Sequence, residues 1–109
     1  MKPHYEVAIG LGKNLRRCRR RVGISQEELG FRSSVHRTEV SKIERGEIMP
    51  RADTLLKLAG GLGVPAQELL DGLAWTPPPV TVPWGSFRVA LSRLGAESSN
   101  GVSRQKVAE

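Results

Sequence analysis

The sequence predicts an all-α domain of five helices over residues 1–72, followed by a proline-rich extension over residues 73–109. Nearly all the apolar residues that recur at helical spacing lie in the first part. Four of the seven prolines lie between Trp75 and Trp84, where they impose an extended backbone. Residues 96–109 contain too few apolar groups to bury a core, so we expect them to be disordered.

The composition is that of an ordinary globular domain, with 39% hydrophobic and 26% charged residues. The net charge of +6 favours a polyanionic partner, either nucleic acid or an anionic membrane surface. No apolar run approaches the roughly 18 residues of a spanning helix, and the first residues do not resemble a secretory signal. The single cysteine, Cys18, excludes an internal disulfide and a cysteine-based zinc site, which favours the reducing cytoplasm.

The first expected helix covers about residues 6–22. It is predicted by apolar residues that fall on one helical face, namely Leu11, Leu15, Cys18 and Val22. Gly10 and Gly12 weaken its start relative to alanine, by about 1 kcal/mol each. Gly23 stands where a helix commonly ends in a left-handed residue.

The second expected helix, Gln26–Arg32, has the clearest start in the chain. Ser25 and Glu28 have the spacing of a capping box, in which Ser25 caps the first turn. Ile24 and Leu29 occupy the two positions of a hydrophobic staple.

Three more helices complete the predicted domain. The third, His36–Arg45, follows a turn around Ser33–Val35 and ends before Gly46. The fifth is short, from Pro65 to Leu70, with Gly72 just beyond its end. The fourth begins after Pro50, is weakened by Gly60 and Gly61, and has an apolar stripe of Leu55, Leu58, Ala59 and Leu62.

Several segments carry a family resemblance. They are Leu15-Arg-Arg-Cys-Arg19, Gly23-Ile-Ser-Gln-Glu-Glu-Leu29, Val40-Ser-Lys-Ile-Glu-Arg-Gly46, Pro50, Leu55-Leu-Lys-Leu-Ala59 and Leu62-Gly-Val64. At these separations they closely resemble the Cro/C1-type helix-turn-helix domain, also called the Xre family, over about residues 9–72. The resemblance implies a lambda-repressor-like fold that places the helix His36–Arg45 in the major groove of DNA.

The resemblance also assigns roles to individual residues. It implies that Gln26 bonds a phosphate and braces the recognition helix. Arg37, Thr38 and Lys42 share one face of that helix, and each can meet a base edge. His36, at the cap position, either touches a phosphate or serves only as a cap. The full set of candidate DNA-binding residues is Gln26, His36, Arg37, Thr38, Ser41, Lys42, Arg45 and Arg51.

The resemblance also implies a partly buried ion pair between Arg19 and Glu44. The role of this pair would be structural, because it would hold the recognition helix in place. The sequence departs from the family at two positions. Ser34 stands where the family commonly has a left-handed glycine, and Gly30 stands where it prefers alanine. Both departures are expected to soften the motif without removing a contact residue.

The extension supports two alternatives. Residues 86–95 could form a helix with Phe87, Leu91 and Leu94 on one face, or a strand in which Phe87, Val89 and Leu91 alternate. The apolar residues of the segment 73–95 are too many for a free linker. We expect this segment to pack on the helical domain or a second subunit, or to bind a protein partner.

These observations predict a sequence-specific transcriptional regulator that binds a palindromic operator as a homodimer in the cytoplasm, at the nucleoid. The alternative is an antitoxin whose helix-turn-helix controls its own operon and whose tail binds the toxin. An enzyme is not expected, because the sequence has no nucleophile–base pair, metal-ligand spacing or Walker-type loop. No cofactor, metal or membrane partner is expected either.

Overall fold

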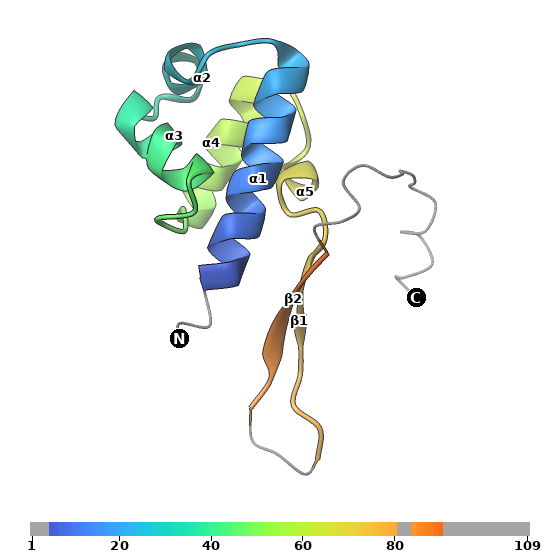
Figure 1. Cartoon of the computed structure of the whole chain (residues 1–109). Helices are drawn as coiled ribbons and strands as arrows, with labels where there is room; N and C mark the ends of the chain where they lie inside the picture. Colours follow the sequence, from blue (N-terminus) through green and yellow to red (C-terminus); the bar gives the residue numbers. More distant parts are fainter. Residues whose placement is uncertain (1–4, 81–83, 91–109) are drawn as a thin grey trace.

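The computed structural model describes residues 5–80 and 84–90 (Figure 1). Its elements in chain order are α1 (Tyr5–Val22), α2 (Gln26–Ser33), α3 (Arg37–Glu44), α4 (Ala52–Leu62), α5 (Ala66–Leu69), β1 (Leu73–Thr76) and β2 (Ser86–Val89). The five predicted helices are confirmed. The observed ends of α1, α2, α3 and α5 lie within one residue of the expected ends.

The extension departs from the all-α prediction, because β1 and β2 pair antiparallel as a hairpin. The strand alternative for residues 86–95 is correct for Ser86–Val89, and the helical alternative is wrong there. The sequence did not predict the first strand, Leu73–Thr76. A stretch of four residues does not by itself indicate a strand, and the partner strand begins ten positions after this one ends. Residues 91–109, which include the segment expected to be disordered, lie outside the described residues.

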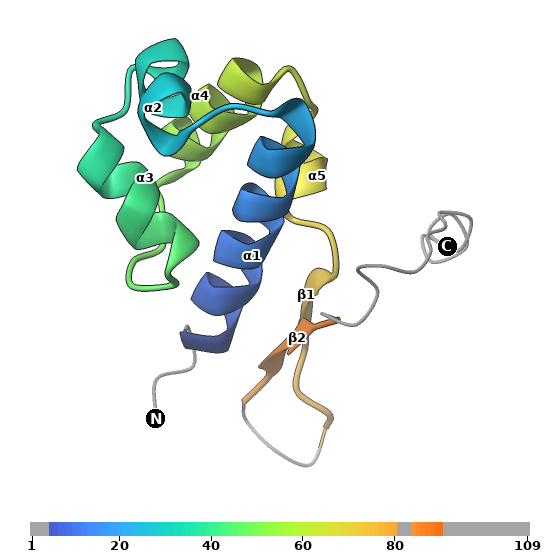
Figure 2. The ribbon, with the colours of Figure 1, turned by 45° about the horizontal axis from the view of Figure 1, so that its top comes forward.

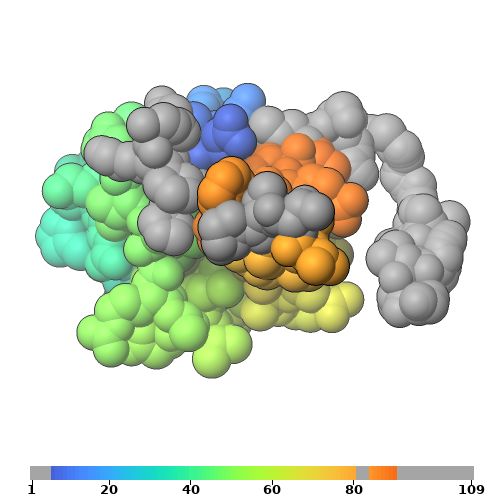
Figure 3. Space-filling view, turned by 90° about the horizontal axis from the view of Figure 1, so that it is seen from below, coloured from blue at the N-terminus to red at the C-terminus, as the bar shows by residue number. Residues whose placement is uncertain are grey.

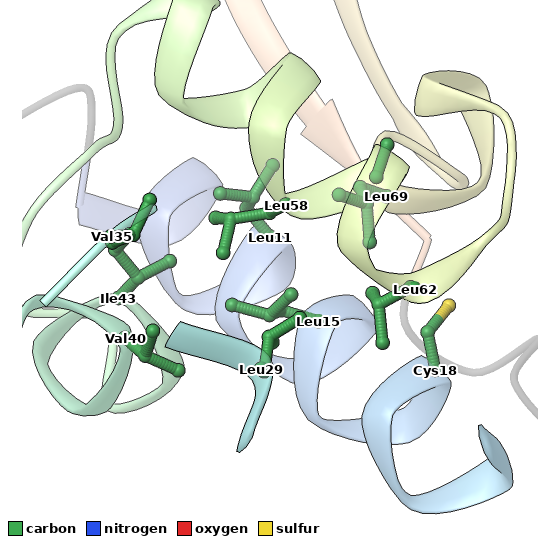
Figure 4. Packing of buried hydrophobic residues seen from close by; sticks show 11 residues of the cluster. Leu11, Leu15, Cys18, Leu29, Val35, Val40, Ile43, Leu58, Leu62 and Leu69 are labelled. Carbon is green, nitrogen blue, oxygen red and sulfur yellow. The ribbon is translucent and has the colours of Figure 1, made fainter. Parts of the chain in front are cut away.

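The core forms where the apolar faces of all five helices meet. Its largest fully buried side chains are Leu11, Leu15, Cys18, Leu29, Val40, Ile43, Leu58 and Leu69. Figure 4 shows Leu11 and Leu15 of α1 at the centre of the cluster, with Val40 and Ile43 of α3 on one side and Leu62 and Leu69 on the other. The helices α2 to α5 have only 4 to 11 residues, so their stability depends mainly on this shared burial.

Helix α1 is the centre of the arrangement. It contacts α3 and α5, which lie on opposite sides of it, while α2 packs against α3 and α4 (Figure 2). None of the helices described between residues 5 and 80 combines the length and apolar character that crossing a membrane requires.

A buried asparagine ties α1 to the base of the hairpin. The Asn14 side chain is 3% exposed, and its Nδ2 donates to the carbonyl oxygens of Leu69 at 3.0 Å and Asp71 at 2.9 Å. Arg17 donates to Asn14 Oδ1 at 2.9 Å. Because these carbonyls lie at the end of α5 and just beyond it, Asn14 fixes where the hairpin begins.

The hairpin has one apolar face. Leu73 lies opposite Val89, and Trp75 opposite Phe87, with the rings of Trp75 and Phe87 edge to face at a centroid distance of 5.0 Å. Leu73 packs against the core, whereas Trp75 is 54% exposed. The outer part of the hairpin projects beyond the helices, on the side of the molecule away from α2 (Figure 1), and it lies nearest the viewer in Figure 3.

Candidate nucleic-acid interface

The turn between α2 and α3 positions the two helices of the motif. Ser34 adopts the left-handed conformation with φ of 57°, and the N–H of Val35 donates to the carbonyl of Gly30 at 3.0 Å. A Cβ at Gly30 would lie 2.5 Å from the carbonyl oxygen of Val35. Gly30 is thus required by the close approach of the turn, which a comparison of helix propensities alone did not reveal.

His36 is the N-cap of α3. Its Nδ1 accepts a hydrogen bond from the N–H of Thr38 at 3.0 Å, so the ring proton of the neutral imidazole is carried by Nε2. The ring is exposed, and Nε2 remains available as a donor.

The exposed face of α3 carries the three candidate base-reading residues. Arg37 and Thr38 lie in the first turn, and Lys42 lies one turn after Thr38 on the same face. Within the described part of the chain, neither Arg37 nor Lys42 forms a side-chain hydrogen bond or an ion pair. Their charges are therefore presented to solvent rather than used inside the protein.

Behind this face, Glu44 joins α1, α2 and α3. Its Oε2 accepts from Arg19 Nε at 2.6 Å, and its Oε1 accepts from Arg19 Nη2 at 3.0 Å and from Gln26 Nε2 at 2.9 Å. Arg19 also donates to the carbonyl of Ile24 at 2.9 Å. The side chains of Arg19 and Glu44 are 12% and 3% exposed, so this is the partly buried pair that the resemblance implied.

Electrostatics strengthens this pair. The hydrogen bond with Glu44 raises the pKa of Arg19 above its ordinary value, outweighing the opposing effect of burial. Gln26 donates one N–H of its side-chain amide to Glu44. The second N–H of this amide makes no hydrogen bond among the described residues, and it lies at the N-terminus of α2.

The end of α3 brings Ser41, Arg45 and Glu47 together. Arg45 bonds the hydroxyl of Ser41, and its Nε lies 2.7 Å from Oε2 of Glu47. Their mutual hydrogen bonding raises the pKa of Arg45 and lowers the pKa of Glu47. Glu47 was not among the residues expected at this interface, although it follows directly after Gly46, the residue at which the helix was expected to end.

Arg51 stands apart from the other candidates. It is the N-cap residue of α4, its side chain makes no capping hydrogen bond, and its Nε lies 3.5 Å from Asp53 Oδ1. Both side chains are strongly exposed, and among the described residues Arg51 forms no hydrogen bond or ion pair with a side chain of α3.

A second glycine, Gly12, also lies at a close approach between backbone segments. A Cβ at Gly12 would lie 2.7 Å from the carbonyl oxygen of Glu44 and would meet that of Ile43 as well. Gly12 therefore allows α1 and α3 to approach closely, so its contribution to packing offsets the helix propensity that it costs.

Comparison with known proteins identifies the same fold. A helix-turn-helix family model matches residues 15–69. An uncharacterised HTH-type transcriptional regulator, y4dJ of Sinorhizobium fredii, is 40% identical over 67 residues, which cover 62% of this chain and 87% of that protein. The control protein C.BamHI of Bacillus amyloliquefaciens is 39% identical over 66 residues, or 60% of this chain and 82% of that one.

Solved structures agree. The restriction-modification controller protein C.AhdI of Aeromonas hydrophila has a TM-score of 0.60 and 37% identity, covering 62% of this chain and 99% of that chain. The P22 c2 repressor in complex with a synthetic operator has a TM-score of 0.53 and 32% identity, covering 57% of this chain and 94% of that chain. The chain belongs to the Cro/C1-type helix-turn-helix family of DNA-binding transcriptional regulators.

Proposed function

We propose that this regulator recognises a palindromic operator as a homodimer, with α3 of each subunit in the major groove. The observation that carries the proposal is the arrangement of α3. Its exposed face presents Arg37, Thr38 and Lys42, while its inner face is fixed to α1 and α2 through Glu44. A rigid helix with unpaired cations matches the groove, which is about 12 Å wide.

Base recognition is assigned to the exposed face. Arg37 can donate two hydrogen bonds to O6 and N7 of a guanine, and Lys42 can reach the same atoms one turn away. Thr38 lies between them on the helix and can meet a base edge or a thymine methyl group.

Phosphate binding is assigned to the flanks of α3. Gln26 offers its second amide N–H and the free backbone N–H groups at the start of α2. His36 offers Nε2–H at the start of α3. The remaining candidates, Ser41, Arg45 and Arg51, lie at the end of α3 and the start of α4.

Dimerisation is assigned to the hairpin. A two-stranded hairpin is marginally stable alone, and the exposed ring of Trp75 continues the apolar face that Leu73 begins. A second copy of the same face would bury both rings about a two-fold axis. That symmetry matches half-sites about 34 Å apart on one side of the duplex.

The relatives described above are regulators, controllers and a repressor, which favours this function over the antitoxin alternative. The proposal places the protein in the cytoplasm, at the nucleoid.

The decisive experiment is the selection of bound sequences from random duplex DNA by the full-length protein. A palindromic motif is expected, because two α3 helices related by a two-fold axis read inverted half-sites. Affinity should fall steeply with salt, and the log–log slope should be about −5 for about six phosphate contacts. Recovery of no motif, or binding insensitive to salt, would contradict the proposal.

A second experiment tests the hairpin. Sedimentation of the wild-type protein is expected to show a dimer, whereas Trp75→Ser should shift the population towards monomer and lower operator affinity without changing the half-site preference. The control is Thr76→Ser, which lies on the polar face of the same strand. A wild-type protein that remains monomeric on its operator would exclude the hairpin as the dimer contact.

A further inference from the structure

The end of the recognition helix holds an acidic residue in a fixed position. Gly46 adopts φ of 75°, its N–H donates to the carbonyl of Ile43 at 3.0 Å, and the N–H of Glu47 donates to that of Lys42 at 2.9 Å. This is a Schellman motif, which sets the direction of the chain after a helix. A Cβ at Gly46 would lie 3.0 Å from Cα of Ile9, so the motif is also fixed against α1.

The Glu47 carboxylate turns back towards α3. Its two oxygens lie 2.7 Å and 3.3 Å from Nε and Nη2 of Arg45, a two-point contact that suits a guanidinium. Arg45 bonds the Ser41 hydroxyl at the same time. The contact is half-exposed, with 54% of the Arg45 side chain and 49% of the Glu47 side chain accessible, so an incoming phosphate can reach it.

Glu47 also acts on a second cation of this surface. The charge of Lys42 contributes to lowering the pKa of Glu47, after the larger effects of Arg45. Arg37, at the other end of the helix, has no acidic partner among the described residues. Glu39 also lies in the first turn of α3, but it forms no hydrogen bond or ion pair with Arg37 among the described residues, so the paired acid of this surface lies at the end of the helix.

We propose that Glu47 competes with DNA phosphates for Arg45 and thereby restrains the affinity of the protein for DNA. This inference rests on the proposed function. A phosphate must displace the carboxylate from Arg45, and the displaced carboxylate then lies beside the polyanion, which repels it. The base-reading Arg37 requires no such exchange. The affinity for DNA therefore depends more on base contacts, and less on phosphate contacts, than a net charge of +6 would lead one to expect.

The test compares the wild-type protein with Glu47→Gln, which keeps the size of the side chain and removes its charge. Fluorescence anisotropy measures the affinity of each full-length protein for a random duplex of about 30 base pairs, which is long enough to span two half-sites one helical turn apart, across a series of salt concentrations. Glu47→Gln should tighten binding by roughly three- to tenfold and steepen the log–log slope by about 0.9, as one added phosphate contact would.

The matched control is Glu68→Gln, which makes the same change in net charge. Glu68 lies on α5 and pairs with Arg21 at 2.8 Å, and Arg21 lies on the side of α1 that faces α5 rather than α3. Its effect on DNA affinity should stay below about twofold, because charges more than a Debye length from the phosphates are screened. Circular dichroism of each variant verifies that the helices are intact.

A second background separates competition from simple repulsion. In Arg45→Ala, the substitution Glu47→Gln should keep only the smaller gain that comes from removing the repulsion, because no guanidinium remains to be released. An undiminished gain in that background would overturn the competition, as would unchanged or weaker binding by Glu47→Gln alone. Absence of DNA binding by the wild-type protein would instead overturn the proposed function, and this inference with it.

Discussion

Glu44 receives two hydrogen bonds from Arg19 and one from Gln26, at 2.6, 3.0 and 2.9 Å. One carboxylate on the recognition helix therefore joins the two helices that precede it. Because both oxygens are used and the side chain is 3% exposed, α3 cannot rotate without leaving a buried charge unpaired.

Loss of Arg19 should be costly for this reason. Arg19→Ala is expected to lower the free energy of unfolding by about 3 kcal/mol or more, since it leaves Glu44 buried and half-satisfied. Urea unfolding followed by circular dichroism measures the change. The exposed pair Arg32–Glu28 is the control, and Arg32→Ala should cost less than about 1 kcal/mol. Equal effects at the two sites would show that burial does not govern the Arg19 pair.

Two adjacent glycines of α4 should respond in opposite directions. A Cβ at Gly60 meets nothing within 4 Å, so Gly60→Ala should stabilise the protein by about 0.5–1 kcal/mol through helix propensity. A Cβ at Gly61 would collide with the hydroxyl of Ser33 on α2, so Gly61→Ala should destabilise it by about 1–3 kcal/mol. Thermal unfolding of both variants tests the pair, and stabilisation by both would mean that α2 can move away from α4 freely.

Base and phosphate contacts should be distinguishable by mutation. Arg37→Ala should cost about 1–3 kcal/mol of binding free energy on the selected operator and relax preference at one base position. Gln26→Ala should weaken all sequences about equally, because phosphates carry no sequence information. Lys57→Ala, on the exposed face of α4, is the charge-matched control for Arg37→Ala. If Arg37→Ala left the selected motif unchanged, another residue of α3 would be the base reader.

The buried thiol of Cys18 should make stability fall at alkaline pH. Burial raises its pKa, with Arg21 and Arg17 opposing less strongly, so the folded protein retains the thiol proton that the unfolded chain releases. The free energy of unfolding should therefore decrease as the pH rises through the ordinary thiol pKa of about 8.5. Urea unfolding across this range should show a shallower decrease for Cys18→Ala; identical slopes would assign the pH dependence to other groups.

The sequence by itself determined where the five helices lie and which face of each helix is apolar. Ser25, Gly23 and Gly46 act on the turn next to them, and the spacing of Leu11, Leu15 and Cys18 is a property of one helix. Such signals are local, so they can be interpreted before the chain is folded. The family resemblance suggested the role of α3 in the same way, because the motif that carries it consists of short contiguous segments.

The tertiary structure decided which residues meet across helices. Four glycines lower helix propensity, but their surroundings differ: Gly12 lies against backbone of α3, Gly30 against backbone of the turn, and Gly61 against a side chain of α2. A Cβ at the fourth, Gly60, would meet nothing within 4 Å. The pairing of β1 with β2 and the contact of Glu47 with Arg45 likewise depend on distances between backbone segments. Helical periodicity specifies a face but not its neighbour, because the neighbour is chosen by the packing of all five helices together.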